Sequence, residues 1–267
     1  MSSVPHPPPS GFDGFVFRAA EEIPRVRSEI PVYVTGPADR PGVIVMHEAG
    51  GMSPTCLDLA RDLAADNGFR VFLPLLFGKP NQERRSGVDM NGLFCMRREM
   101  LYWAADATSP ITGLIRQLVV EVGERTGRPK VGVIGMCLTG NLTFGLMAEP
   151  NVGAVIAAEP SLPLVMPVRR LRWLTRRHKR AALSLSPADL AASVRSRTPL
   201  LALRFEGDVI CPVERFDALQ AAFEGRDILT VDTLDGDGHS VLTRDRTVEN
   251  DRVPRVRAFL TEHLDAG

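Results

Sequence analysis

A cysteine at a sharp turn between a predicted strand and a predicted helix is the strongest chemical signal in this sequence. Val131 to Ile134 form a short apolar run, and Cys137 follows in the pattern Gly135-x-Cys137-x-Thr139. A nucleophile elbow strains its central residue, so only small residues fit two places on either side of it. Gly135 meets this demand fully, and Thr139 meets it less well than glycine would. The turn would expose the Cys137 sulfur at the N-terminus of a helix, where unpaired amides favour the thiolate.

Cys137 could instead be a small buried residue that ends a core strand, because free cysteine is among the most buried residue types. The residues downstream favour the chemical interpretation. Asp208 follows a predicted strand and lies in a loop, and His239 follows the next predicted strand in a glycine-flanked loop. Ligands of α/β sheets bind beyond the carboxyl ends of the strands. Asp208 alone could form a turn and His239 alone could be a surface residue, but nucleophile, acid and base occur in the chain order of α/β-hydrolases.

The apolar patterns predict strands and helices that alternate along one large domain. We expect strands at 12–17, 30–34, 43–46, 70–73, 131–134, 153–157, 200–204 and 228–231, and helices at about 55–67, 91–105, 110–127, 138–147, 213–224 and 247–264. Alternation at this spacing indicates a mostly parallel central sheet with helices on both faces. We assign residues 12–267 to this α/β domain and residues 1–11 to a flexible, proline-rich tail.

Composition and charge exclude several classes of function. The 267 residues contain 32 Lys and Arg and 32 Asp and Glu, and this balance argues against nucleic acid as a partner. No apolar stretch is long enough to span a membrane. The N-terminal residues lack the features of a signal peptide. The four cysteines show no metal-binding spacing, so we expect reduced thiols, a cytoplasmic location and no metal.

A basic segment interrupts the alternating pattern at about 164–183. It contains seven Arg and Lys residues and no acidic residue. It could be a solvated, partly helical surface insertion. It could also be a cap that attracts anionic substrates or contacts a partner. A role at a membrane surface has weaker support because the apolar face of the segment is short.

The sequence resembles the dienelactone hydrolase family from about Phe12 to the C-terminus, apart from the basic segment. The matching pieces are Val43-Ile-Val-Met-His-Glu-Ala-Gly-Gly, Gly135-Met-Cys-Leu-Thr-Gly, Glu206-Gly-Asp-Val-Ile-Cys-Pro and Gly238-His-Ser. The resemblance implies an α/β-hydrolase fold and a reaction without a cofactor. It also implies that Cys137 attacks an ester or lactone carbonyl, that His239 carries the proton, and that Asp208 orients His239.

The same resemblance implies roles for residues around the triad. Glu48 would lie beside the cysteine and influence its ionisation, and the backbone amides of Ala49 and Leu138 would form the oxyanion hole. Arg98 and Tyr102, four residues apart on one helix face, would bind a substrate carboxylate, although a solvated Arg and a half-buried Tyr are equally compatible with the pattern.

Three positions depart from the family pattern. Thr139 replaces glycine in the elbow, and Leu75-Leu76 stands where the family usually has an acidic residue. A second carboxylate-binding arginine of the family corresponds to Thr243, with Arg244 beside it as the candidate substitute. These departures bear on the identity of the substrate more than on the hydrolase chemistry.

Together these observations predict a hydrolase that cleaves a small, possibly anionic ester or lactone through a Cys137 acyl-enzyme. A thioesterase or a general carboxylesterase with the same triad is an alternative. A third hypothesis is a catalytically weak binding protein that uses the basic segment 164–183.

Overall fold

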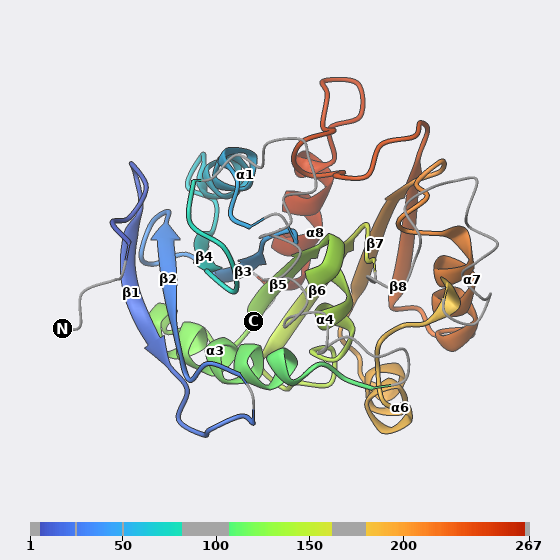
Figure 1. Ribbon diagram of the computed structural model, residues 1–267, viewed down its shortest axis with the longest axis horizontal. Helices are drawn as coiled ribbons and strands as arrows, with labels where there is room; N and C mark the ends of the chain where they lie inside the picture. The colour runs from blue at the N-terminus through green and yellow to red at the C-terminus, as the bar shows by residue number, and fades with distance from the viewer. Residues whose placement is uncertain (1–5, 25, 50, 82–106, 162–179, 265–267) are drawn as a thin grey trace.

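The computed structural model describes residues 6–24, 26–49, 51–81, 107–161 and 180–264 (Figure 1). Its centre is an eight-stranded sheet in the order β1-β2-β4-β3-β5-β6-β7-β8. The two pairings β1–β2 and β2–β4 are antiparallel, and every other pairing is parallel. This arrangement confirms the predicted fold class, a mostly parallel sheet of the α/β type.

All eight predicted strands are present, most of them slightly longer than expected. They are β1 (Asp13–Arg18), β2 (Glu29–Thr35), β3 (Gly42–Met46), β4 (Arg70–Pro74), β5 (Val131–Met136), β6 (Val152–Ala158), β7 (Leu200–Phe205) and β8 (Leu229–Leu234). β3, β5 and β7 are buried at every residue, because helices cover both faces of the sheet at these central strands.

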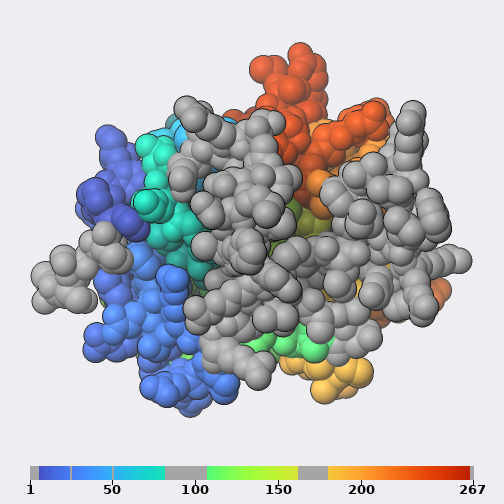
Figure 2. All heavy atoms as spheres, viewed as in Figure 1, coloured from blue at the N-terminus to red at the C-terminus, as the bar shows by residue number. Residues whose placement is uncertain are grey.

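Two layers of helices cover the sheet. The helices are α1 (Pro54–Ala64), α3 (Pro110–Thr126), α4 (Gly140–Phe144), α6 (Pro187–Arg195), α7 (Val213–Ala222) and α8 (Val253–Leu264). Side chains of α1 and α8 share one buried cluster with one face of the sheet. Side chains of α3, α4 and α7 share a second cluster with the other face. Each layer therefore has its own hydrophobic core. In Figure 2 the blue and teal N-terminal elements and the orange and red C-terminal elements lie on opposite sides of the face in view.

Two helix predictions need correction, and one helix was not predicted. The helix expected from 247 begins at Val253, because Pro254 fits only the first turn of a helix and the Asp251 side chain accepts a hydrogen bond from the Val253 N–H at 2.9 Å. The helix expected at 138–147 is instead a short 3₁₀ turn, η1 (Cys137–Thr139), followed by α4. Helix α6 was not predicted, although Ser186 caps it and Pro187 opens it.

Several predictions concern residues outside the described ranges. The helix expected at 91–105 lies there, and so does the basic segment up to residue 179. At the end of the segment, Arg180 forms an ion pair with Glu214 of α7 at 2.7 Å. Among the helices in the described part of the chain, none is long and apolar enough to cross a membrane.

Candidate active site

Cys137 occupies a strained backbone position at the carboxyl end of β5. Its φ is +54°, which few non-glycine residues adopt. A Cβ at Gly135 would lie 2.5 Å from the carbonyl oxygen of Thr139, so a larger residue could not occupy position 135. The Cys137 side chain is half-buried. The turn therefore has the geometry expected of a nucleophile elbow, with the thiol presented beyond the end of the sheet.

Thr139 fits the elbow through its hydroxyl group. Its side chain is fully buried, and Oγ1 accepts a hydrogen bond from the Met136 N–H at 3.0 Å. The same oxygen lies 3.0 Å from the carbonyl oxygen of Met46 and 3.1 Å from that of His47, at the end of β3. A threonine thus ties the elbow to the neighbouring strand, which glycine could not do.

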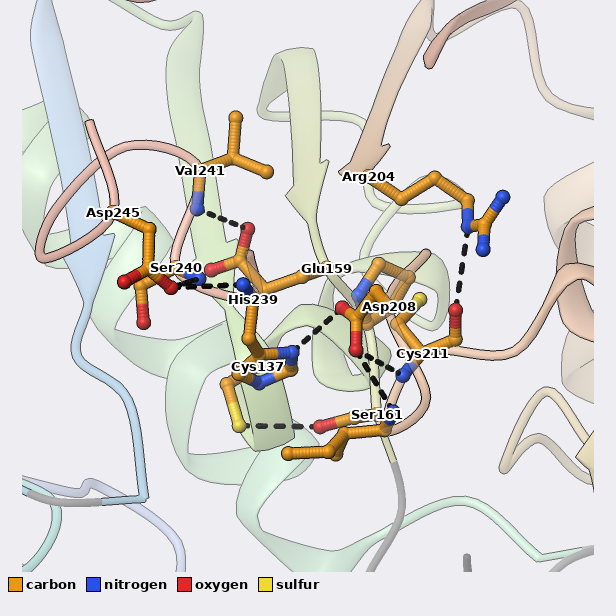
Figure 3. Close-up of polar contacts among 12 residues, drawn as sticks. Cys137, Glu159, Ser161, Arg204, Asp208, Cys211, His239, Ser240, Val241 and Asp245 are labelled. Atoms are coloured by element: carbon orange, nitrogen blue, oxygen red, sulfur yellow. Dashed lines mark hydrogen bonds and ion pairs between the residues drawn. The ribbon is translucent and has the colours of Figure 1, made fainter. Parts of the chain in front are cut away.

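His239 and Asp208 form a hydrogen-bonded pair beside Cys137 (Figure 3). The Nδ1 atom of His239 lies 2.7 Å from Oδ2 of Asp208. The other carboxylate oxygen of Asp208 accepts hydrogen bonds from the backbone N–H groups of Ile210 and Cys211, at 2.8 and 3.0 Å. Asp208 is buried, and these two backbone hydrogen bonds orient its carboxylate. The carboxylate in turn orients the imidazole ring of His239.

Asp245 shapes the loop that carries His239. Its Oδ2 accepts hydrogen bonds from the backbone N–H groups of His239 and Ser240, at 2.8 and 2.9 Å. Burial alone would raise the pKa of Asp245, but these hydrogen bonds and the charge of Arg244 lower it. The loop after β8 is therefore held by a carboxylate that stays ionised at neutral pH.

The electrostatic environment favours an ion pair between Cys137 and His239. Burial opposes ionisation of Cys137, but the positive charge of His239 leaves the pKa of the thiol lowered. Burial also opposes the charged form of His239, but the charge of Cys137 and the hydrogen bond with Asp208 raise its pKa to about 12. Both shifts favour a thiolate beside an imidazolium, the reactive form of a cysteine nucleophile.

Glu48 lies in the same site but is held by the His239 loop. Its Oε2 accepts a hydrogen bond from the Ser240 hydroxyl at 3.1 Å, and its Oε1 accepts a short one from the Thr243 hydroxyl. The negative charge of Glu48 raises the pKa of Cys137 and so opposes formation of the thiolate. Thr243, one of the departures from the family pattern, thus binds Glu48.

Arg244 reaches the same network from the protein surface. Its side chain is 68% exposed, and Nη2 donates a hydrogen bond to the Ser240 hydroxyl oxygen at 3.2 Å. The guanidinium also lies 3.6 Å from Asp245. Of the three predicted substrate-binding residues, Arg244 is the one that lies in the described part of the chain.

The two predicted oxyanion-hole amides lie at the ends of adjacent strands. Ala49 follows β3, and Leu138 follows Cys137 after β5, which pairs with β3. The Ala49 N–H makes no backbone hydrogen bond in the described part of the chain. Arg98 and Tyr102 lie outside the described residues.

The loop after β6 adds two residues that the sequence analysis missed. The Oγ atom of Ser161 lies 3.1 Å from the sulfur of Cys137. Glu159 is fully buried, and its Oε2 accepts a hydrogen bond from the Val241 N–H at 3.2 Å. Their position just beyond a predicted strand was the available signal, since the same reasoning selected Asp208 and His239.

His47 is a further histidine near the site, and its hydrogen bonds give it a structural role. Its Nε2 accepts a hydrogen bond from the Leu76 N–H at 3.1 Å, and its Nδ1 lies 2.9 Å from the carbonyl oxygen of Glu48. Burial lowers the pKa of His47 to about 4. His47 is therefore a neutral residue that joins the loops after β3 and β4. Among the described residues, no cluster of three His, Cys, Asp or Glu side chains could hold a metal ion.

Comparison with known families gives one match that covers most of the chain. The profile of the dienelactone hydrolase family matches residues 30–260. No match is found among curated protein sequences.

Solved structures share the whole fold at low sequence identity. A candidate dienelactone hydrolase from Klebsiella pneumoniae subsp. pneumoniae is 17% identical, with a TM-score of 0.65 over 96% of this chain and 99% of that chain. An esterase from Pyrococcus furiosus is 12% identical, with a TM-score of 0.57 over 95% and 93% of the two chains. The thioesterase domain from the curacin biosynthetic pathway is 13% identical, with a TM-score of 0.57 over 94% and 99%. At these identities the likeness shows a common α/β-hydrolase fold.

Proposed function

The chain belongs to the dienelactone hydrolase family, and we propose that it hydrolyses a small ester or lactone through a covalent intermediate on Cys137. The observation that carries this proposal is the 2.7 Å hydrogen bond between His239 and Asp208 beside a cysteine with a φ of +54°. A half-buried thiol with a lowered pKa, next to an oriented histidine, is suited to acyl transfer.

In the first half of the reaction, the thiolate of Cys137 attacks the carbonyl carbon of the ester. The developing oxyanion would accept hydrogen bonds from the amides of Ala49 and Leu138, which lie at the ends of adjacent strands. The tetrahedral intermediate collapses to an acyl-thioester, and the imidazolium of His239 gives its proton to the departing alkoxide. In a lactone the alkoxide stays attached to the acyl group.

In the second half, the now neutral His239 accepts a proton from water, and the hydroxide attacks the thioester carbonyl. Collapse of this intermediate expels the Cys137 thiolate and releases a carboxylic acid. Asp208 holds the imidazole in one orientation and stabilises its charged form in both halves. The thiolate and the imidazolium are then both restored.

A substrate with its own carboxylate is the second part of the proposal. Arg244 provides an exposed cation one residue from the Thr243–Glu48 hydrogen bond, and Arg98 and Tyr102 remain candidates from the family resemblance. A cation near the site would favour anionic esters over neutral ones.

The proposal is tested by hydrolysis of p-nitrophenyl acetate, cis- and trans-dienelactone and one acyl-thioester, with wild type and Cys137→Ala compared. Each turnover should depend on Cys137, and Cys137→Ala should remain folded by circular dichroism because the change is small and lies at a turn. Preference for dienelactone would assign the family substrate to this chain. Preference for the thioester would favour the alternative of a thioesterase with the same triad.

Ester hydrolysis retained by folded Cys137→Ala would overturn the assigned nucleophile. If wild type and the variant were equally inactive on all four compounds, the proposed reaction would be wrong. Salt-sensitive binding of a partner by the basic segment 164–183 would then be the hypothesis to pursue.

A further inference from the structure

Glu159 is a buried acid in the active site that the proposed reaction does not use. It follows β6 directly, between the strands that carry Cys137 and Asp208, and it is fully buried. Its φ is +37°, an uncommon backbone conformation for a residue other than glycine. Its N–H donates a hydrogen bond to the carbonyl oxygen of Leu203 in β7, at 2.8 Å. Strained residues of this kind persist where the surrounding structure holds them, and they gather at functional sites.

The Glu159 side chain contacts the loop that carries the catalytic base. Its Oε2 accepts a hydrogen bond from the Val241 N–H at 3.2 Å, across 82 residues of sequence (Figure 3). Val241 lies two residues after His239 and is fully buried. The second oxygen, Oε1, is buried and has no hydrogen-bond partner in the described part of the chain.

The two residues after Glu159 are fixed just as firmly. The carbonyl oxygen of Pro160 accepts a hydrogen bond from the buried guanidinium of Arg215 at 2.6 Å. The backbone N–H of Ser161 donates to the carbonyl oxygen of Cys137 at 3.0 Å. The loop at 159–161 therefore touches the nucleophile through Ser161 and the His239 loop through Glu159.

We propose that Glu159 is a positioning residue whose hydrogen bond with the Val241 N–H holds the His239 loop and so sets the distance between Cys137 and His239. This inference rests on the proposed acyl-transfer function of the same site. The Glu159 side chain acts through Val241 and does not touch the reacting atoms. Misplacement of a catalytic group by about 1 Å can lower a rate about 100-fold, so such a contact is significant for turnover.

The surroundings of Glu159 favour the uncharged carboxylic acid over the carboxylate in this role. Burial raises the pKa of Glu159 well above its ordinary value, and the negative charge of Glu48 raises it further. The Cys137 thiolate also opposes ionisation, whereas the positive charge of His239 and the hydrogen bond from Val241 favour it. A protonated Glu159 adds no further negative charge next to a thiolate that Glu48 already destabilises.

Two substitutions separate position from charge. Glu159→Gln keeps the length, the uncharged state and an oxygen that can accept from the Val241 N–H. Glu159→Met keeps a similar volume but removes the acceptor. We expect Glu159→Gln to retain kcat within about threefold. We expect Glu159→Met to lower kcat about 10–100-fold with little change in KM, and to shift the pH midpoint for alkylation of Cys137 by iodoacetamide.

Thermal unfolding gives a readout that is independent of turnover. A carboxyl group with a raised pKa must take up a proton on folding whenever the pH exceeds its unfolded pKa of 4.5. Glu159→Gln removes this requirement. Its Tm should exceed that of wild type by at least about 2 °C at pH 8, and the difference should shrink toward pH 4.

Asp232→Asn is the matched control. Asp232 is also buried, but it pairs with Arg252, just before α8, and with Arg255 of α8, at 2.9 and 3.1 Å. This variant should unfold at a lower temperature with unchanged kcat and an unchanged alkylation profile.

Equal loss of kcat in Glu159→Gln and Glu159→Met would overturn the proposal, because charge would then matter rather than position. A normal alkylation profile and normal kcat in Glu159→Met would overturn it as well. If Glu159→Met does not fold, the Tm comparison of Glu159→Gln with wild type decides, and a lower Tm for Glu159→Gln at pH 8 would contradict the uncharged state. Failure of wild type to hydrolyse any ester would refute the proposed function alone, since alkylation and Tm still report on Glu159.

Discussion

The hydroxyl oxygen of Ser161 lies 3.1 Å from the sulfur of Cys137. Ser161 is buried, its N–H donates to the carbonyl oxygen of Cys137, and its own carbonyl oxygen accepts a hydrogen bond from the Asn141 side chain. A thiolate can only accept a hydrogen bond, so the Ser161 hydroxyl must donate to it in the reactive form. This contact lowers the pKa of Cys137, in addition to the effect of His239.

Replacing Ser161 with alanine should slow the reaction of Cys137 with iodoacetamide at pH 7 about tenfold. A hydrogen bond to a charged group contributes about 1.5–3 kcal/mol, and its loss disfavours the thiolate. The measurement is the alkylation rate between pH 5 and 9. The control is Ser193→Ala, which removes a buried hydrogen bond from α6 to the Phe144 carbonyl oxygen. An unchanged profile in Ser161→Ala would mean that the hydroxyl does not donate to the thiolate.

The His239 imidazolium should keep Cys137 reactive below the ordinary pKa of a thiol, about 8.5. The pKa of Cys137 is lowered, so the wild-type alkylation rate should fall less steeply between pH 8.5 and 6.5 than that of an ordinary thiol. In His239→Gln the positive charge is absent, and the rate at pH 6.5 should drop about 100-fold. His263→Gln, which removes a ring contact with Phe259 on α8, serves as the control. A rate that falls equally steeply in wild type would argue against the ion pair.

Arg98→Ala and Arg244→Ala test recognition of a substrate carboxylate. Each change should raise KM about tenfold for an ester that carries a free carboxylate and much less for a neutral ester, because a charged hydrogen bond is lost only with the former. The comparison requires both substrates and both variants. Arg226→Ala is the control, since Arg226 binds the carbonyl oxygens of Arg195 and Ser196 at the surface. Equal changes in KM for both esters would show that the replaced arginine does not bind the substrate carboxylate.

Thr139→Val should lower the free energy of unfolding by about 1–3 kcal/mol. Valine has nearly the same shape, but it leaves the Met136 N–H and a carbonyl group at the end of β3 without the hydroxyl partner that they have now. Thr139→Ser keeps that hydroxyl and should recover most of the loss. Urea denaturation of the three proteins measures the difference. Similar stability of the valine and serine variants would show that the hydroxyl contributes little.

His47 should make the protein less stable as the pH falls from 6.5 to about 4. Its pKa is lowered from 6.5 to about 4 by burial, so in this window the unfolded chain binds the additional proton. The shift corresponds to a decrease of about 3 kcal/mol in the free energy of unfolding at pH 4. His47→Gln should be less stable at pH 7 but should lose less stability on acidification. Parallel curves of unfolding free energy against pH in the two proteins would contradict a neutral His47.

The sequence predicts the sheet well because the relevant signals are local. Each strand is a short apolar run such as Val43 to Met46, which helices cover on both sides. Helix starts were less predictable. Val253 begins α8 because of Asp251 and Pro254, and this capping outweighs the periodic pattern that extends further upstream.

The sequence by itself determined the order of Cys137, Asp208 and His239 and their position after strands. In a parallel sheet this placement brings the residues together at the carboxyl ends of the strands, whatever the conformation of the loops. Only the tertiary structure decided what surrounds them. Ser161 reaches Cys137 across 24 residues and Glu159 reaches Val241 across 82. Such contacts depend on burial and on the directions of hydrogen bonds between loops that are far apart in the sequence. No local pattern of residues encodes either.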